Sequence, residues 1–202
     1  MGLHKTLLAS ILRGGAAGGA SFSDDDYSNI FFNTNQNTYK YEDIPLKVSS
    51  SIAFTRPANT TAYTFGDLVA NNTTAGSVTP ISVDAARAID TVSSMIRCRL
   101  EKTGTSVTSA IFRVHFYNEL PTVTNGDNGV WLSTQAGYVG SVDITVDKAF
   151  SDGAEGIGAP SAGSALIFAP VSGTTTLYAL IEARAAYTPV SGEQFQIHVE
   201  VL

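Results

Sequence analysis

The sequence predicts an all-β protein: an antiparallel β-sandwich or jelly-roll-like body preceded by a short N-terminal arm, helical or extended. The first observation is the alternation of apolar and polar residues between Val92 and Leu120, which is typical of strands with one buried face. The second is the segment 193–201, in which the same alternation continues. The third is the recurrence of Gly, Pro, Asn and Asp between short apolar runs, which indicates turns between about eight to ten strands.

Length and composition fit one globular β-domain with an appended N-terminal segment. The chain has 202 residues, of which 44% are hydrophobic, enough for a packed core. Its formal net charge is −6; residues 1–20 contain Lys5 and Arg13 and no acid, which is +2, so the remainder carries −8. An acidic body argues against nucleic acid as a partner, because phosphate binding needs a clustered basic face. No apolar run approaches the ~20 residues of a membrane span, so we expect no membrane partner.

Residues 1–20 are predicted to form an arm followed by a glycine-rich hinge. Leu3, Leu7 and Ile11 recur every fourth residue, which places them on one side of a short amphipathic helix. Because so short a helix is marginal alone in water, we interpret these three residues as candidate partner-binding residues that become ordered on a neighbouring surface. Residues 14–19, GGAAGG, are the expected hinge. A terminus without a binding role is the alternative that the sequence leaves open.

Residues 21–43 are predicted to be an irregular linker, and residues 44–202 to be the β-sandwich domain. The linker is polar apart from several aromatic residues, which we expect to pack on another surface. Turn residues divide the domain into strand candidates. These lie at 46–55, 63–70, 77–83, 92–102, 108–118, 129–133, 138–146, 164–170, 175–187 and 193–201.

The segment from Val92 to Leu120 is predicted to be two long strands joined by a tight turn at 102–105. The residues expected on its core face are Ile96, Cys98, Leu100, Phe112, Val114 and Phe116. Cys98 is therefore expected to be a small buried hydrophobe and not a reactive thiol. The opposite face carries the densest basic patch of the acidic body, formed by Arg97, Arg99, Arg113 and His115. Arg97, Arg99 and Arg113 are candidate partner-binding residues; a solvated sheet face is the alternative.

No catalytic constellation is apparent, and we expect a protein that is not an enzyme. The three histidines, His4, His115 and His198, lack the spaced Asp, Glu or Cys residues of a metal site, so no metal and no cofactor are expected. The glycine-rich segment 153–164 lacks the Lys-Ser/Thr ending of a phosphate-binding loop and is predicted to be a flexible loop.

Aromatic residues provide an alternative binding surface. Trp131 and Tyr138, together with Tyr117 and Tyr178, have the side chains that stack on sugars. Aromatic residues on strands are more often core or interface. Glycan binding by Trp131 and Tyr138 is therefore kept as a second hypothesis.

One stretch resembles a known group of proteins. Residues 54–69, FTRPANTTAYTFGDLV, are similar to the "RPADTTAYAAGDVV" opening of small structural proteins of tailed bacteriophages. The segments 95–100 (MIRCRL), 112–117 (FRVHFY), 126–128 (GDN) and 138–142 (YVGSV) resemble the same group. The resemblance covers residues 48–146, and its departures are Asn59 for the usual acid and Phe65 for a small residue.

The resemblance implies a non-enzymatic structural protein of the virion. Within that class we favour a capsid decoration, or cement, protein made in the cytoplasm of the host bacterium. It would bind the major capsid protein on the capsid exterior as a homo-oligomer, with a trimer suited to the symmetry of capsid axes. The alternative is a carbohydrate-binding or structural β-module of a phage tail or fibre.

Overall fold

The computed structural model describes residues 30–32, 39–41, 46–132, 136–161 and 165–202. The chain divides into two compact units, residues 1–45 and residues 46–202. The predictions for Leu3, Leu7 and Ile11 lie outside the described residues. In the first unit, β1 (Ile30–Phe32) pairs with β2 (Tyr39–Tyr41) in antiparallel register. The segment 21–43, predicted to be irregular, therefore contains a short strand pair.

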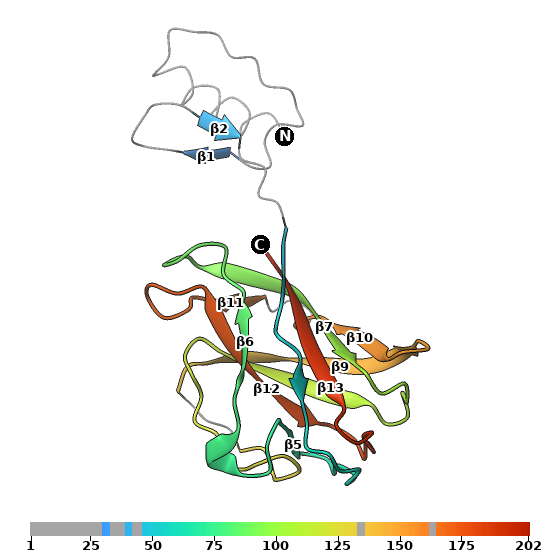
Figure 1. Cartoon of the computed structure of the whole chain (residues 1–202). Coiled ribbons are helices and arrows are strands. Elements are labelled where there is room, and N and C mark those ends of the chain that lie inside the picture. The colour runs from blue at the N-terminus through green and yellow to red at the C-terminus, as the bar shows by residue number, and fades with distance from the viewer. Residues whose placement is uncertain (1–29, 33–38, 42–45, 133–135, 162–164) are drawn as a thin grey trace, which may run out of the picture. The chain divides into compact units, whose positions relative to one another are not determined.

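The second unit is all-β, as predicted, and its strands pair in antiparallel fashion (Figure 1). A single 3-10 turn, η2 (Ala75–Ser77), interrupts the described strands of this unit. The strands are β3 (Lys47–Ser50), β4 (Phe54–Thr55), β5 (Leu68–Val69), β6 (Ile81–Asp84), β7 (Ser93–Lys102), β8 (Ile111–Tyr117), β9 (Tyr138–Ala149), β10 (Ala154–Gly158), β11 (Leu166–Phe168), β12 (Thr176–Ala183) and β13 (Gln194–Val201).

The sheet curls so that its two halves enclose the core. The strand order is β3-β13-β7-β10-β9-β8-β12-β5, with β4 on β13, β11 on β7 and β6 on β12. The long strand β9 joins the halves, since one end pairs with β10 and the rest pairs with β8. Across the core, the Phe112 ring of β8 lies edge-on to the Phe195 ring of β13, with 5.5 Å between centroids. This arrangement is compatible with the predicted sandwich.

The predicted pairing of the two strands between Val92 and Leu120 is wrong. β7 bonds to β13, β10 and β11, whereas β8 bonds to β9 and β12. The connection after β7 therefore crosses from one half of the sheet to the other. Eight residues separate Lys102 from Ile111, more than a two-residue hairpin turn needs, and they allow this crossing.

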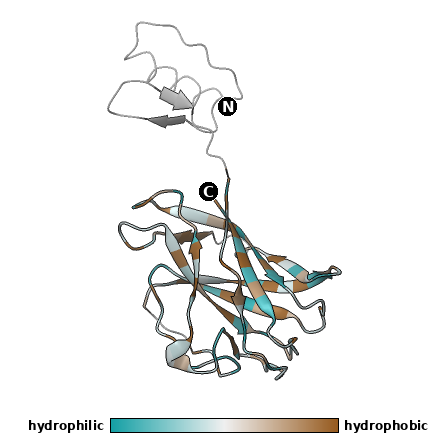
Figure 2. Cartoon of the chain, in the orientation of Figure 1, coloured by the Kyte–Doolittle hydropathy of each residue, from teal (hydrophilic) through white to brown (hydrophobic). Residues whose placement is uncertain are grey.

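The predicted core face is confirmed except at Ile96. Phe112, Val114, Phe116, Cys98 and Leu100 are completely buried. Ile96 is 40% exposed, because β7 carries a β-bulge where the register on β13 passes from Arg97 to Met95. Met95 takes the inward position in its place. Along β13 the alternation holds as expected, and Figure 2 shows hydrophobic and hydrophilic residues succeeding each other along this strand.

Three further expectations are wrong. The glycine-rich segment predicted to be a flexible loop contains β10, packed between β7 and β9. A Cβ on Gly156 would lie 2.2 Å from the carbonyl oxygen of Thr145, so this glycine permits a close approach of two backbones. The strand predicted at 63–70 shrinks to β5. Of the strand predicted at 129–133, residues 129–132 are described, and they form a single bridge, between Val130 and Asp67.

Candidate functional site

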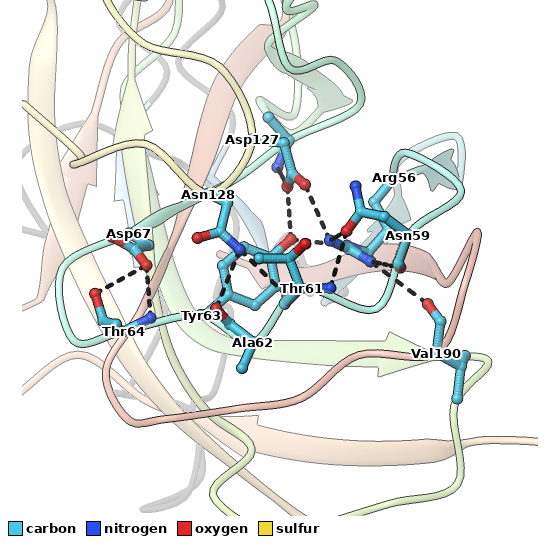
Figure 3. A network of polar contacts seen from close by, with 11 residues as sticks. Arg56, Asn59, Thr61, Ala62, Tyr63, Thr64, Asp67, Asp127, Asn128 and Val190 are labelled. Carbon is cyan, nitrogen blue, oxygen red and sulfur yellow. Dashed lines mark hydrogen bonds and ion pairs between the residues drawn. The ribbon is translucent and has the colours of Figure 1, made fainter.

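A buried arginine organises the stretch that carries the phage resemblance. Arg56 follows β4, and Pro57 prevents continuation of the strand by removing a backbone donor. The Arg56 guanidinium donates from Nε to the Tyr63 hydroxyl at 2.7 Å and from Nη1 to the Asn59 carbonyl at 2.8 Å. Its Nη2 atom forms an ion pair with Asp127 Oδ2 at 3.0 Å (Figure 3). The side chains of both charged residues are buried, with exposures of 0% and 1%.

Asp127 completes the network from a distant loop. Its Oδ1 atom accepts hydrogen bonds from the Tyr63 hydroxyl at 2.5 Å and from the Ala70 backbone N–H at 2.9 Å. The preceding Gly126 lies so close to the backbone that a Cβ would come within 1.9 Å of the Thr73 carbonyl. The following Asn128, at a φ of 63°, donates to the carbonyl oxygens of residues 61 and 62 at 3.2 Å. We name Arg56, Tyr63 and Asp127 the Arg56 network.

The Arg56 network is suited to holding loops together. The partners of Arg56 occupy its donors inside the fold: the Tyr63 hydroxyl, the carbonyl and side-chain oxygens of Asn59, and the Asp127 carboxylate. The pKa of Tyr63 is raised, chiefly by burial and then by the neighbouring Asp127 charge, so its hydroxyl remains a donor. Breaking a buried ion pair by removing one partner typically costs about 3–5 kcal/mol. The network therefore fixes the loop 56–67 against the loop 126–128.

A second buried ion pair was missed by the sequence analysis. Lys102 Nζ lies 3.2 Å from Glu193 Oε1, with both side chains fully buried, and donates to the Gly104 carbonyl at 2.6 Å. The Tyr187 hydroxyl donates to the same Glu193 oxygen at 2.6 Å. Burial lowers the pKa of Lys102, against the opposing effect of the Glu193 charge. Lys102 was assigned to a turn; in fact it ends β7 with its side chain inside.

The predicted basic patch is not formed. Arg97 and Arg99 lie on β7, whereas Arg113 lies on β8 in the other half of the sheet. Each arginine is also paired with acid: Arg97 with Glu200 at 2.5 Å, Arg99 with Glu101 and Glu155, and Arg113 with Asp143 at 2.6 Å. His115, the fourth expected member, is buried. The strand pairing that separates β7 from β8 accounts for the error.

The predicted glycan-stacking residues lie together but are partly covered. The Trp131 ring stacks on the His115 ring, with 3.8 Å between centroids and 11° between planes. Tyr138 is 42% exposed and packs edge-on against Tyr117 at 5.4 Å. The His115 Nε2 atom lies 2.9 Å from Glu182 Oε2. One face of Trp131 is therefore used to hold the loop before it against β8.

Within the described part of the chain, no cluster of three or more His, Cys, Asp or Glu residues has the arrangement of a metal site. Among the same residues, no helix is long and apolar enough to cross a membrane. Comparison of the chain with protein-family models and with curated protein sequences finds no match in either.

Proposed function

We propose that this protein is a non-enzymatic structural component of a tailed-phage virion, most specifically a capsid decoration protein on the capsid exterior. The observation that carries the proposal is the ion pair between Arg56 and Asp127. Arg56 belongs to the RPANTTAY stretch and Asp127 to the separate GDN stretch, and both stretches carry the resemblance. The two stretches that carry the resemblance therefore meet in one buried contact and form a single structural unit.

The second unit exposes several large apolar side chains, including Ile52 at 87%, Val92 at 70% and Phe65 at 65%. Assembly contacts that covered such side chains would remove apolar surface from water, which is favourable. The proposed partner is the major capsid protein, with copies of this chain assembling as homotrimers. Many modest contacts repeated over a shell give strong total binding through avidity.

Electron cryomicroscopy of isolated virions tests the proposal directly. We expect density for the β-domain on the outside of the capsid, and purified protein added to undecorated shells should co-sediment with them. Density on the tail or fibre would instead support the alternative, a tail module. A glycan array probed with the wild type and with Tyr138→Ala then tests carbohydrate binding. Absence of the protein from virions would overturn both assignments.

A further inference from the structure

The curled sheet leaves an open seam between its two ends. β4 pairs with β13 and β6 pairs with β12; within the described residues, neither has a second partner strand. Lys47 on β3 bridges one end of the seam, donating to the Ala86 carbonyl at 2.5 Å and pairing with Asp84 at 3.3 Å. In Figure 1 the seam runs between β6 and the chain that leads from β3 toward β5.

A groove of about 400 Å³ occupies this seam beside the bridge. One wall is residues 52–55 and the other is residues 79–82, with Asn71 completing the lining. A narrower extension continues from Phe54 and Ile81 to Val69 and Leu180. Phe54 is partly buried against the main core, so the groove gives access to the edge of that core. We name it the seam groove.

The walls of the seam groove define the chemistry of an occupant. They contain no ionisable side chain, so a charged segment would lose hydration without gaining a partner. The walls include the free edges of β4 and β6. Backbone N–H and C=O groups at a free edge are available to pair with another extended backbone. Pro80 contributes no N–H, and the Thr79 N–H already donates to Asn71 Oδ1 at 2.9 Å, so a donor on that wall has to come from residues 81–82. An extended, uncharged segment about four residues long therefore fits.

We propose that the seam groove accepts such a segment of a partner protein as an added β-strand. Strand addition at an exposed edge gives affinity through main-chain hydrogen bonds and specificity through side-chain pockets. The identification of the partner as the major capsid protein rests on the function proposed above. The proposal of strand addition does not depend on that function.

Two other occupants fit the groove less well. The free edges of a second copy carry Lys47 on β3 and Asp84 on β6, and these would bring charge to a neutral groove. The apolar run of the arm, residues 7–12, is LLASIL, in which leucine and alanine favour a helix over a strand. A β-branched, uncharged partner strand has neither disadvantage.

The full-length, ¹⁵N-labelled protein titrated with a blocked peptide tests strand addition. The probe is acetyl-Thr-Val-Thr-Val-Thr-amide, and its controls are the same peptide with alternate N-methylated amides and acetyl-Thr-Glu-Thr-Glu-Thr-amide. We expect the first peptide alone to shift the amide resonances of residues 52–55 and 79–82. Equal shifts from the N-methylated peptide, or no shifts from any peptide, would overturn the proposal.

Two matched variants test whether the seam groove is needed for binding to capsid shells. Ser82→Glu places a charge on the groove wall, and Thr145→Glu places the same charge at an exposed hydroxyl residue of β9 outside the groove. Ser82→Glu should abolish the peptide shifts and reduce co-sedimentation with shells, while Thr145→Glu changes neither. Full shell occupancy by Ser82→Glu would exclude the capsid protein as the partner. If the wild-type protein occupies shells but does not bind the peptide, strand addition at the seam groove is wrong and the proposed function still stands.

The remaining outcomes identify the other occupants. Tighter peptide binding after deletion of residues 1–20 would show that the arm fills the groove, and the proposal would be wrong. Shifts at residues 52–55 that grow with protein concentration in the absence of peptide would assign the groove to a second copy, with the same consequence.

Discussion

Arg56 and Asp127 stand 71 positions apart and form an ion pair of 3.0 Å inside the fold. Asp127 receives two further hydrogen bonds, from the Tyr63 hydroxyl and from the Ala70 N–H. Because each partner is buried, loss of one leaves the other as an uncompensated charge.

Replacement of Asp127 by Ala is therefore expected to reduce the free energy of unfolding by about 3–5 kcal/mol. Denaturant titration of the purified variant measures this change. The matched control is Asp143→Ala, because Asp143 also pairs with an arginine but its side chain is 61% exposed. Exposed pairs contribute about 0–1 kcal/mol, so equal losses for the two variants would contradict the structural role assigned to Arg56.

Phe112 is the centre of the aromatic contacts between the two halves of the sheet. Its ring packs edge-on against Phe195 at 5.5 Å and against Tyr187 at 5.3 Å. Phe112→Ala should cost about 3–5 kcal/mol by leaving a cavity at this position. Phe150→Ala, at a residue that is 53% exposed, should change stability far less. Thermal melting of both variants measures the loss of stability. An unchanged melting temperature for Phe112→Ala would show that Phe112 does not lie in the core.

The glycine at position 156 is expected to tolerate no side chain. Its Cβ would meet the backbone of Thr145 at 2.2 Å, so Gly156→Ala forces β10 away from β9 and should cost about 1–3 kcal/mol. Gly76→Ala is the control, since nothing lies within 4 Å of the Cβ it would acquire. Equal stability of the two variants would show that the segment 153–164 is the flexible loop of the original prediction.

His115 and Trp131 provide an optical measure of protonation. The pKa of His115 is lowered below the usual 6.5, chiefly by burial; Glu182 opposes the shift, and Arg113 and Arg184 add to it. Trp131 is the single tryptophan of the chain and stacks on this imidazole, so protonation should quench its fluorescence. We expect quenching on acidification with a midpoint below pH 6.5, absent in His115→Gln. A midpoint at or above 6.5 would contradict the assigned burial.

The lowered pKa of His115 also makes the free energy of unfolding depend on pH. Between the lowered pKa of folded His115 and the value of about 6.5 in the unfolded chain, the unfolded state binds more protons. The stability linked to His115 is thus fully present above pH 6.5 and is lost as the pH falls toward the folded pKa. The unfolding free energy of the wild type should decline more than that of His115→Gln across this window.

Local alternation predicted individual strands better than their partners. The inward positions of Phe112, Val114 and Phe116 follow from a period of two, which is a property of one strand. The pairing of β7 with β13 depends on residues about 100 positions away, and no local pattern records it. Ile96 was misplaced because a one-residue bulge inverts the alternation beyond it.

The site residues show the same division. The RPANTTAY stretch stands out only through its resemblance, and no local pattern distinguishes Arg56 from the other arginines as a buried residue. Its companion Asp127 lies in a loop whose sequence alone predicts only a turn. Lys102 and Glu193 were also missed, because a charged residue at the end of a strand is usually exposed. A signal was available in Gly104, whose missing side chain leaves room for the Glu193 carboxylate.

The position of β13 between β3 and β7 has a consequence for the rate of folding. Ser50 on β3 faces His198 on β13 across 148 positions of sequence, so neither β3 nor β4 finds its sheet partner until the chain closes this loop. Topologies dominated by such distant contacts fold on timescales of about milliseconds to seconds. Until the loop closes, the edge of β13 that receives β3 and β4 stays unpaired, and an open strand edge favours aggregation of the partly folded chain.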